Sequence, residues 1–357
     1  MTTKLLVNRA RISEAKLADR AAVALTVGDV RVRVDQFALT ANNISYALQG
    51  ERIGYWRFFP DQEDGWGVVP IWGFGTVTES LCDAVAVGTT IWGFLPMASD
   101  LVMRPERVTP GGFTDGAVHR QELPYVYNLY ARTNGDAPVL ADMADLRSLV
   151  FPLFTTSYVL DDYIADNADF GAVQVILGSA SSKTAFGLAH FLKARGGLKV
   201  IGLTSPGNIG FVEGLGYYDQ VLSYDAVGSL DPAVPTVFVD MSGNGDVVSA
   251  VHHHFGDQLK ASIGVGATHW SAPRAGQTLP GPRPAFFFAP GQIAKRDTEW
   301  GRGEMMRRAT AANIAFCQIL GNRVTIAHEQ GSEAVAAAYR LMAAGQNPPD
   351  RGLILQF

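Results

Sequence analysis

Small and hydroxyl-bearing residues fill one ten-residue stretch, GSASSKTAFG at 178–187. It follows an apolar run and precedes a segment whose apolar residues recur at helical spacing, so it is predicted to be a strand-to-helix turn. The amino terminus of a helix offers free amides and the positive end of a dipole, and such a turn can bind phosphate. The candidate cofactor-binding residues of the turn are Gly178, Ser179, Ala180, Ser181, Ser182, Lys183 and Thr184.

Three interpretations of this turn differ in chemistry. A Walker A loop requires GxxxxGK[ST], with the lysine six positions after the first glycine. Here Gly178 precedes Lys183 by five positions and Ser182 replaces the second glycine, which argues against an ATP-binding loop. A serine pair that only caps the helix is the simplest interpretation of the turn taken alone. A dinucleotide-binding turn needs a tight bend and close approach to a pyrophosphate, which small residues permit less freely than glycine.

The end of the next predicted strand, VIGLTSPGN, bears on the type of dinucleotide. An acidic residue there would bind the ribose 2'-hydroxyl of NAD and repel the 2'-phosphate of NADP. Thr204 and Ser205 stand at this place, and Lys183 supplies a nearby cation. The residues therefore favour NADP(H) as the cofactor.

The predicted secondary structure that positions the turn changes along the chain, from short strands to alternating strands and helices. From Leu5 to about Gly135 short alternating apolar runs lie between glycines, which is typical of a β-rich lobe. From residue 172 strands alternate with helices, which predicts a doubly wound parallel sheet. Strands are expected at 172–177, 198–204, 220–224, 236–241 and 260–266, with a last one at GLILQF, and helices at 141–149, 155–164, 305–320 and 332–344.

Composition narrows the class of protein. The 357 residues are 47% hydrophobic and 18% charged, enough for a large core and about two domains. A net charge of -5, without a long basic run, argues against a nucleic-acid partner. The charged amino terminus and the lack of a long apolar segment predict a cytoplasmic protein with no membrane partner.

Cysteine and histidine usage argues against a metal site. Cys82 and Cys317 are far apart, so neither a disulfide framework nor a zinc-binding cysteine pair is expected. Three adjacent histidines at 252–254 would point in different directions on a helix, so a solvated or helix-end role is expected for them.

Several segments, taken in order, resemble the medium-chain dehydrogenase/reductase superfamily in its zinc-independent quinone-oxidoreductase-like branch. ANNISYALQG (41–50) resembles the NPxD segment of that branch, and GSASSKTAFGLA takes the place of its glycine-rich loop. More narrowly, the SASSKTA loop and the GYWRFFP and FFFAP stretches resemble a bacterial family with a domain of unknown function. The other matching segments are VPIWGFGTV (69–77), VGTTIWGF (87–94), GYYDQVLSYD (216–225), VFVDMSGN and SIGVGATHW.

The resemblance implies an α/β fold: a GroES-like β-rich catalytic domain and a Rossmann doubly wound parallel-sheet domain. The catalytic domain would comprise residues 1–150 and, after the Rossmann domain at 151–290, a return at 291–357. It further implies an NADPH-dependent, zinc-independent reductase that transfers a hydride to an α,β-unsaturated carbonyl, quinone or ketone, and a homodimer. The alternative is a catalytically inactive dinucleotide-binding or regulatory protein, because the central glycines of the family's loop are replaced.

The resemblance also implies site residues. Tyr46 would stabilise the developing oxyanion or enolate, and Asn42 or Asn43 would orient the nicotinamide carboxamide or a substrate carbonyl. The family's lysine for the 2'-phosphate is missing near Asn208, and Lys183 would replace it. The remaining cofactor-binding candidates are Tyr224, Ser242, Gly243, Gly264, Gly266 and His269.

Each catalytic candidate has a structural interpretation beside the functional one. An Asn pair often marks a turn, and a Tyr in an apolar run is often part of the core. His119 is a further catalytic candidate, although a single histidine is often structural. The aromatic segment ERIGYWRFFP (51–60) would either wall an apolar substrate pocket or pack the β-rich lobe.

Overall fold

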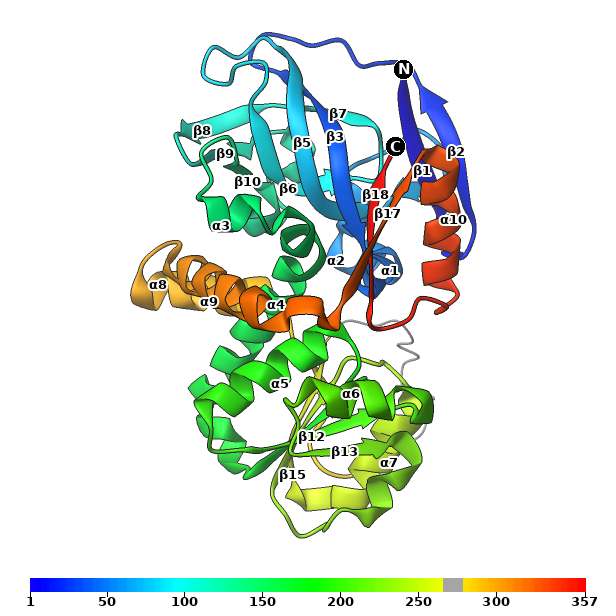
Figure 1. The fold of residues 1–357 in the computed structure, drawn as a ribbon, viewed down its shortest axis with the longest axis vertical. Coiled ribbons are helices and arrows are strands. Elements are labelled where there is room, and N and C mark those ends of the chain that lie inside the picture. The colour runs from blue at the N-terminus through cyan, green and yellow to red at the C-terminus, as the bar shows by residue number, and fades with distance from the viewer. Residues whose placement is uncertain (266–278) are drawn as a thin grey trace. The chain divides into compact units, whose positions relative to one another are not determined.

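The computed structural model describes residues 1–265 and 279–357. It divides into two compact units, one comprising Met1–Pro152 and Val324–Phe357 and the other Leu153–Arg323. Figure 1 shows the elements of both units with their labels.

Parallel strands form the sheet of the second unit, as the alternation of strands and helices predicts. Their order is β13-β12-β11-β14-β15-β16, which is the strand order of a dinucleotide-binding Rossmann sheet. The five strands expected from 172 to 266 are confirmed, and a short sixth strand joins the edge. Their bounds are β11 (Gln174–Gly178), β12 (Lys199–Thr204), β13 (Gln220–Ser223), β14 (Thr236–Asp240), β15 (Leu259–Gly264) and β16 (Ala285–Phe286).

Helices extend the second unit past residue 290, where the sequence places the return to the first domain. Arg296 of α8 forms an ion pair with Asp162 of α4, with 2.8 Å between Nε and Oδ2. Phe316 of α9 stacks on His190 of α5, with ring centroids 4.0 Å apart. The helices are α4 (Ala144–Asp166), α5 (Lys183–Arg195), α6 (Ile209–Leu215), α7 (Gly245–Phe255), α8 (Ala289–Trp300) and α9 (Glu304–Leu320).

A single helix, α4, stands where two helices were expected. It runs through Pro152, which cannot donate a backbone hydrogen bond to the preceding turn. Phe151 and Phe154 on either side of the proline are buried. Packing of the flanking residues therefore outweighs the lost hydrogen bond, and the helix remains continuous.

The first unit contains two sheets. The larger has the order β17-β18-β3-β5-β6-β10-β9-β8, with β7 paired to β3, and the smaller has the order β2-β1-β4. The strands are β1 (Thr2–Asn8), β2 (Ala15–Arg20), β3 (Val30–Leu39), β4 (Trp66–Val68), β5 (Pro70–Ser80), β6 (Thr90–Pro96), β7 (Asp100–Met103), β8 (Pro105–Thr109), β9 (Gly112–Asp115), β10 (Leu129–Arg132), β17 (Thr325–Gln330) and β18 (Arg351–Gln356). The helices include α1 (Ala41–Leu48), α2 (Gly50–Ile53), α3 (Pro138–Ala141) and α10 (Ser332–Ala343), so the expected helix near 332–344 and the final strand are confirmed.

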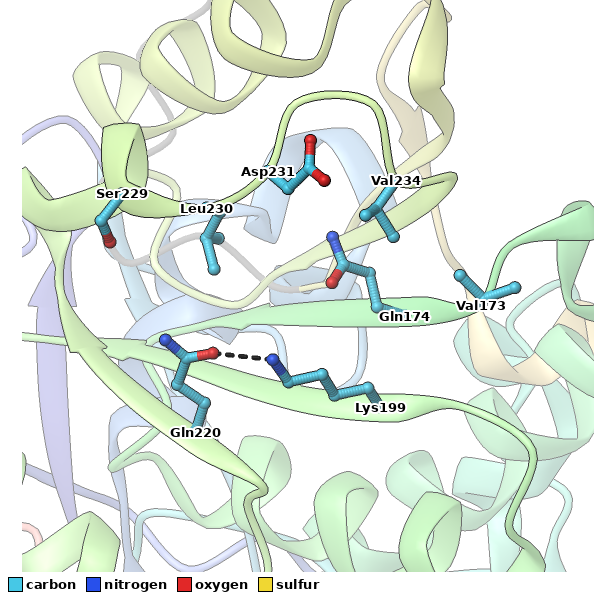
Figure 2. A pocket seen from close by; sticks show the side chains of 8 residues that line it. All are labelled: Val173, Gln174, Lys199, Gln220, Ser229, Leu230, Asp231 and Val234. Carbon is cyan, nitrogen blue, oxygen red and sulfur yellow. Dashed lines mark hydrogen bonds between the residues drawn. The ribbon is translucent and has the colours of Figure 1, made fainter.

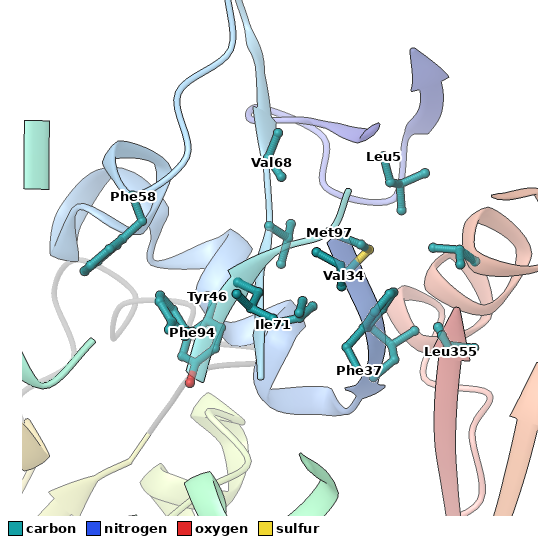
Figure 3. Close-up of a cluster of buried hydrophobic side chains, with 14 of the residues drawn as sticks. Leu5, Val34, Phe37, Tyr46, Phe58, Val68, Ile71, Phe94, Met97 and Leu355 are labelled. Carbon is teal, nitrogen blue, oxygen red and sulfur yellow. The ribbon is translucent and has the colours of Figure 1, made fainter. Parts of the chain in front are cut away.

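The two faces of the larger sheet differ, because side chains alternate along each strand. Ile71 and Val77 of β5 belong to the buried core of the unit, whereas Trp72 and Phe74 on the opposite face are half-buried. Figure 3 shows part of this core, which includes Leu5, Val34, Phe37, Met97 and Leu355. Trp72 on the second face donates a hydrogen bond to the catalytic candidate Tyr46.

The first half of α4 packs on this second face. A Cβ at Gly352 of β18 would lie 2.3 Å from Cδ2 of Leu149, so the helix packs closely over this glycine. Phe151 of the same helix makes an edge-on contact with Trp92, with centroids 6.4 Å apart.

Ion pairs hold the smaller sheet. The side chain of Asp61 is 1% exposed and lies 2.9 Å from Nη2 of Arg20 and 3.1 Å from Nζ of Lys4. Burial alone would raise the pKa of Asp61, but the hydrogen bonds from Arg20 and Lys4 outweigh it and lower that pKa to about 2.

Candidate functional site

The strand-to-helix turn is confirmed. Strand β11 ends at Gly178 and α5 begins at Lys183, with Ser182 as its N-cap. The Ser182 hydroxyl accepts a hydrogen bond of 3.3 Å from the amide of Ala185. Part of the capping interpretation is therefore correct, because this serine stabilises the helix rather than facing a ligand with a free oxygen.

Ser179 bends the chain in a conformation that usually requires glycine. Its φ is +57°, in the left-handed region, which costs about 1–3 kcal/mol for a residue with a side chain. Two backbone hydrogen bonds hold it there: the Ala180 amide donates to Leu203 at 2.9 Å, and the Ser182 amide donates to Ser179 at 2.8 Å. Strain held in this way is typical of a functional turn.

A glycine on the neighbouring strand allows the turn to lie close to the sheet. A Cβ at Gly202 of β12 would lie 2.9 Å from Cβ of Ala180 and 2.9 Å from Cδ1 of Tyr218. The hydroxyl of Tyr218 donates to the carbonyl of Ala180 at 2.8 Å. Gly202 and Tyr218 were missed at the sequence level, since neither belongs to the loop that they position.

The buried Ser181 hydroxyl is held by two neighbouring side chains. Its oxygen accepts hydrogen bonds from Thr204 Oγ1 at 3.4 Å and from Asn208 Nδ2 at 3.2 Å. A serine oxygen has two acceptor positions and one O–H donor. Thr204 and Asn208 therefore fix the position of this hydroxyl in the turn.

The residues at the end of β12 serve this turn in different ways. Thr204 is 1% exposed, so it acts through Ser181 instead of touching a cofactor itself. Ser205 is half-buried and begins the short 3-10 helix Pro206–Asn208. As the sequence indicates, no carboxylate stands between Thr204 and Asn208.

Tyr224, the expected partner of the 2'-phosphate, reaches the turn. It begins the 3-10 helix Tyr224–Ser229, and its side chain hydrogen bonds with Ser179. Burial raises the pKa of Tyr224 and the bond with Ser179 opposes that rise, so the phenol remains neutral at physiological pH.

Asp240 organises the next loop, and its role was missed at the sequence level. It ends β14 in register with Gly178 on one side and Gly264 on the other. Its carboxylate accepts from the Ser242 hydroxyl at 2.6 Å and from the amide of Gly243 at 3.0 Å. Burial raises the pKa of Asp240.

Gly178 is required by this arrangement, because a Cβ there would lie 2.8 Å from Oδ1 of Asp240. The carboxyl ends of the central strands thus bring together Gly178, Ser179, Ser181, Tyr224, Ser242, Gly243 and Gly264. This is the edge at which open α/β sheets bind ligands. The remaining two predictions on this edge, Gly266 and His269, lie outside the described residues.

A depression at the opposite edge of the same sheet is separate from this site. Figure 2 shows its lining, which comes from the amino ends of β11, β12 and β13 and from the loop before β14. Its volume is about 370 Å³, and Lys199 within it donates to Gln220 at 2.9 Å. Its position at the amino ends of the strands makes it an unsuitable place for the cofactor.

In the first unit, Tyr46 carries the candidate chemistry. It lies on α1 and is 6% exposed, with its ring edge-on to Phe94 at 5.5 Å (Figure 3). The indole Nε1 of Trp72 donates to the Tyr46 hydroxyl at 3.1 Å, and the side chain of Asn42 bonds to the same oxygen. Burial raises the pKa of Tyr46 far above its ordinary value, and the bonds from Trp72 and Asn42 only partly oppose this.

Aromatic side chains surround Tyr46 on the second face of the sheet. Trp72 stacks on Trp92, with centroids 5.0 Å apart and an interplanar angle of 28°. Arg147 of α4 lies 4.7 Å from the ring centre of Trp92 and pairs with Asp136 at 2.5 Å. These rings and the Arg147 guanidinium pack against one another beside Tyr46.

Asn43 has a structural role, contrary to the expectation that it contacts the cofactor. Its Oδ1 accepts from the amide of Thr40 at 2.8 Å, and its Nδ2 donates to the carbonyl of Pro70 at 2.9 Å. It is 2% exposed. The side chain caps α1 and ties it to β5, so it fixes the helix on which Tyr46 lies.

His119 and the 51–60 segment also contribute to packing. The His119 Nε2 lies 3.1 Å from the carbonyl of Phe58, which directs this ring nitrogen at the backbone. Tyr55, Trp56 and Phe58 are buried in the core of the first unit, which favours the packing interpretation of this segment. Next to His119, the buried Arg120 pairs with Asp115 at 2.6 Å.

The three histidines of α7 lie in its last turn, so the helix-end role is confirmed, but they are not all solvated. His252 is 0% exposed, and its ring nitrogens lie 2.8 Å from the Pro280 carbonyl and 2.9 Å from Ser262 Oγ. Burial lowers the pKa of His252. His254 lies 2.8 Å from the carbonyl of Leu230. In the described part of the chain, no group of three His, Cys, Asp or Glu side chains is arranged to hold a metal ion.

A family model described as "Protein of unknown function (DUF2855)" matches residues 37–348, most of the chain. The chain belongs to this family. A search of curated protein sequences finds no match. Within residues 1–265 and 279–357, no helix combines the length and apolar character needed to cross a membrane.

Solved structures share the fold over nearly the whole chain. CurA from Vibrio vulnificus, in complex with NADPH, is 13% identical with a TM-score of 0.62, and the match covers 99% of this chain and 98% of CurA. A mutant enoyl thioester reductase from Candida tropicalis is 9% identical with a TM-score of 0.59, covering 100% and 99%. A mycobacterial protein complexed with NADPH is 12% identical with a TM-score of 0.56, covering 100% of both chains. The expected fold class, a GroES-like β-rich domain with a Rossmann domain, is thereby confirmed.

Proposed function

We propose that this protein is an NADP(H)-dependent oxidoreductase that reduces a conjugated carbonyl compound, an enone or a quinone. The observation that carries the proposal is the turn at 178–184, where a strained Ser179 and a Ser181 hydroxyl held by Thr204 and Asn208 follow the central strand of a Rossmann sheet. NADPH is present in the structure of CurA and in that of the mycobacterial protein, both of similar fold. When bound, this cofactor supplies the hydride.

The residues of the second unit fit this cofactor. Ser181 would donate to a pyrophosphate oxygen, and the first turn of α5 would add amides that lack intrahelical acceptors. Thr204 and Ser205 stand in place of the acidic residue that selects NAD, and Lys183 and Tyr224 would hold the 2'-phosphate. Ser242 and Gly243, held by Asp240, and Gly264 line the same edge of the sheet.

Tyr46 is the hydrogen-bond donor to the substrate oxygen. Addition of a hydride to the β-carbon of an enone moves an electron pair onto the carbonyl oxygen, and the α-carbon takes a proton from water afterwards. A neutral phenol whose pKa is raised by burial keeps its proton throughout and stabilises that oxygen by donating a hydrogen bond. The rings of Trp72 and Trp92 favour a flat conjugated substrate over a simple ketone.

A titration with NADPH and with NADH, followed by tryptophan fluorescence, tests the cofactor. We expect NADPH to bind more tightly, and oxidation of NADPH in the presence of 2-cyclohexenone or 1,4-benzoquinone to be slowed in Tyr46→Phe. Absence of binding by either nucleotide would overturn the proposal. Binding of NADPH without turnover of any enone, quinone or ketone would instead support a dinucleotide-binding protein that has lost hydride transfer.

A further inference from the structure

The Tyr46 hydroxyl receives hydrogen bonds from two directions. Nε1 of Trp72 donates to it across 3.1 Å from strand β5, and Asn42 bonds to it from one turn earlier on α1. An indole carries an N–H donor and no acceptor, so Trp72 is the donor in its bond with the phenol oxygen. Among the described residues, no acceptor is recorded for the Tyr46 proton.

We propose that Trp72 is a positioning residue that, together with Asn42, commits the Tyr46 hydroxyl to donating its proton toward the substrate oxygen. A phenol can both donate and accept, and a free one would rotate between these uses. With the Trp72 N–H directed at a lone pair of the phenol oxygen, the O–H group of Tyr46 is kept for donation to the substrate. This inference rests on the proposed function, because it concerns the donor that acts on the substrate.

The indole of Trp72 is held rigidly enough for this task. It stacks on Trp92 at 5.0 Å and lies 5.2 Å from Phe94, and Trp72 and Phe94 are direct partners in the β5–β6 register. Phe94 also contacts the ring of Tyr46 edge-on at 5.5 Å. The same aromatic cluster therefore fixes both the indole that gives the hydrogen bond and the phenol that receives it.

The Trp72 N–H also strengthens Tyr46 as a donor. As the phenol gives its hydrogen bond to a developing enolate, electron density rises on its own oxygen. Fixed dipoles pointing at that oxygen stabilise the increase without reorganising, and hydrogen bonds in such a chain polarise one another. The effect is greatest in the transition state, so loss of the Trp72 N–H is expected to lower kcat more than it changes KM.

Trp72→Phe is the direct test, since phenylalanine keeps an aromatic ring but has no N–H group. With NADPH and the probe carbonyl that Tyr46 acts on, we expect kcat to fall about fivefold, the worth of one hydrogen bond, with KM changed less than about twofold. Asn42→Ala, at a half-buried position of α1, should shift kcat in the same direction. Trp66→Phe is the matched control, because Trp66 of β4 stacks with Lys16 and has no recorded contact with Tyr46 among the described residues.

A second readout does not depend on turnover. In protein labelled with ¹³C at the Tyr Cζ, the Tyr46 resonance is identified by its absence in Tyr46→Phe. We expect Trp72→Phe and Asn42→Ala to move that resonance and Trp66→Phe to leave it in place. An unmoved resonance in Trp72→Phe would overturn the inference.

A double-mutant cycle separates this inference from the proposed function. If Trp72 acts through Tyr46, adding Trp72→Phe to Tyr46→Phe should change kcat by less than about twofold. A full fivefold loss in the double variant would show that Trp72 acts independently, which overturns the inference and leaves the role of Tyr46 intact. If Tyr46→Phe itself retains full kcat with every probe carbonyl, the proposed role of Tyr46 fails, and the inference fails with it.

Discussion

At Ser179, substitution by glycine should relieve backbone strain, whereas loss of the hydroxyl should weaken cofactor binding. Variants at this position therefore test folding stability and cofactor affinity separately. Its φ of +57° is left-handed, a region that costs a residue with a Cβ about 1–2 kcal/mol relative to glycine. At most positions glycine is instead less stable than alanine by about 0.5–1 kcal/mol, because its unfolded chain is more flexible. The first effect exceeds the second at this position.

We therefore expect Ser179→Gly to unfold at a higher urea concentration than Ser179→Ala, by about 0.5–1 kcal/mol in free energy. Both variants lose the hydrogen bond with Tyr224, so its loss cancels in the comparison. The control is the same pair of substitutions at Ser249, which lies in the regular helix α7. There the alanine variant should be more stable than the glycine variant by about 1 kcal/mol.

Cofactor affinity should respond differently. If the Ser179 hydroxyl and its partner Tyr224 contribute to the phosphate site, both Ser179→Gly and Ser179→Ala should bind NADPH about fivefold more weakly, the worth of one hydrogen bond. Fluorescence titration measures this. An alanine variant at least as stable as the glycine variant would refute the strain argument, and unchanged affinity in both would show that the hydroxyl contributes nothing to binding.

Three further predictions concern other parts of the structure. Gly202→Ala should lower the free energy of unfolding by about 1–3 kcal/mol and weaken NADPH binding, because the added Cβ would contact Ala180 of the turn. The control is Gly214→Ala on α6, where the added Cβ has nothing within 4 Å. It should leave thermal stability unchanged or raise it. Arg120→Met should cost about 3–5 kcal/mol in urea unfolding by leaving the buried Asp115 unpaired, and retention of wild-type stability would contradict this. The pKa of Asp61 is lowered to about 2 in the folded state. Its contribution of roughly 2 kcal/mol to the free energy of unfolding is therefore present above the pKa of the unfolded chain and is lost as the pH falls through about 2. Acid unfolding of Asp61→Asn should lack that part of the pH dependence.

Local sequence patterns were sufficient to predict the parallel sheet and the position of the turn. The strands of the second unit are short apolar runs separated by helical segments, and a run buried on both faces can be recognised without knowing its neighbours. The chemistry of the turn could also be read from its residue types. Missing acidic and glycine residues are properties of the segment itself, so the sequence alone could indicate both the NADP(H) preference and the departure from the usual fingerprint.

Residues that act across the fold could not be predicted in this way. Asp240 was seen only as the end of a strand, although it holds the Ser242–Gly243 loop. Trp72 lies 26 positions after Tyr46, and only the β5 register places its indole beside the phenol. Asn43 had the residue type of a ligand-binding amide, but both of its polar atoms are used within the fold. These outcomes depend on long-range pairing, which single-segment patterns do not contain.

In this turn, a glycine on the neighbouring strand makes room that glycines within the loop usually provide. In the usual fingerprint, glycines in the loop permit the bend, the approach to pyrophosphate and the packing of helix on strand. Here Ser179 takes the bend at a cost in strain, and the close approach of the loop is made possible by Gly202 on the adjacent strand. Tyr218 then fixes the loop carbonyl from outside. Because the loop no longer needs to be empty of side chains, it can carry hydroxyl groups, and Ser181 can give the phosphate a donor that glycine would have to supply from the backbone. A hydroxyl-rich loop facing a glycine in the second strand is therefore a physical signature for which other Rossmann sheets without the glycine fingerprint can be searched.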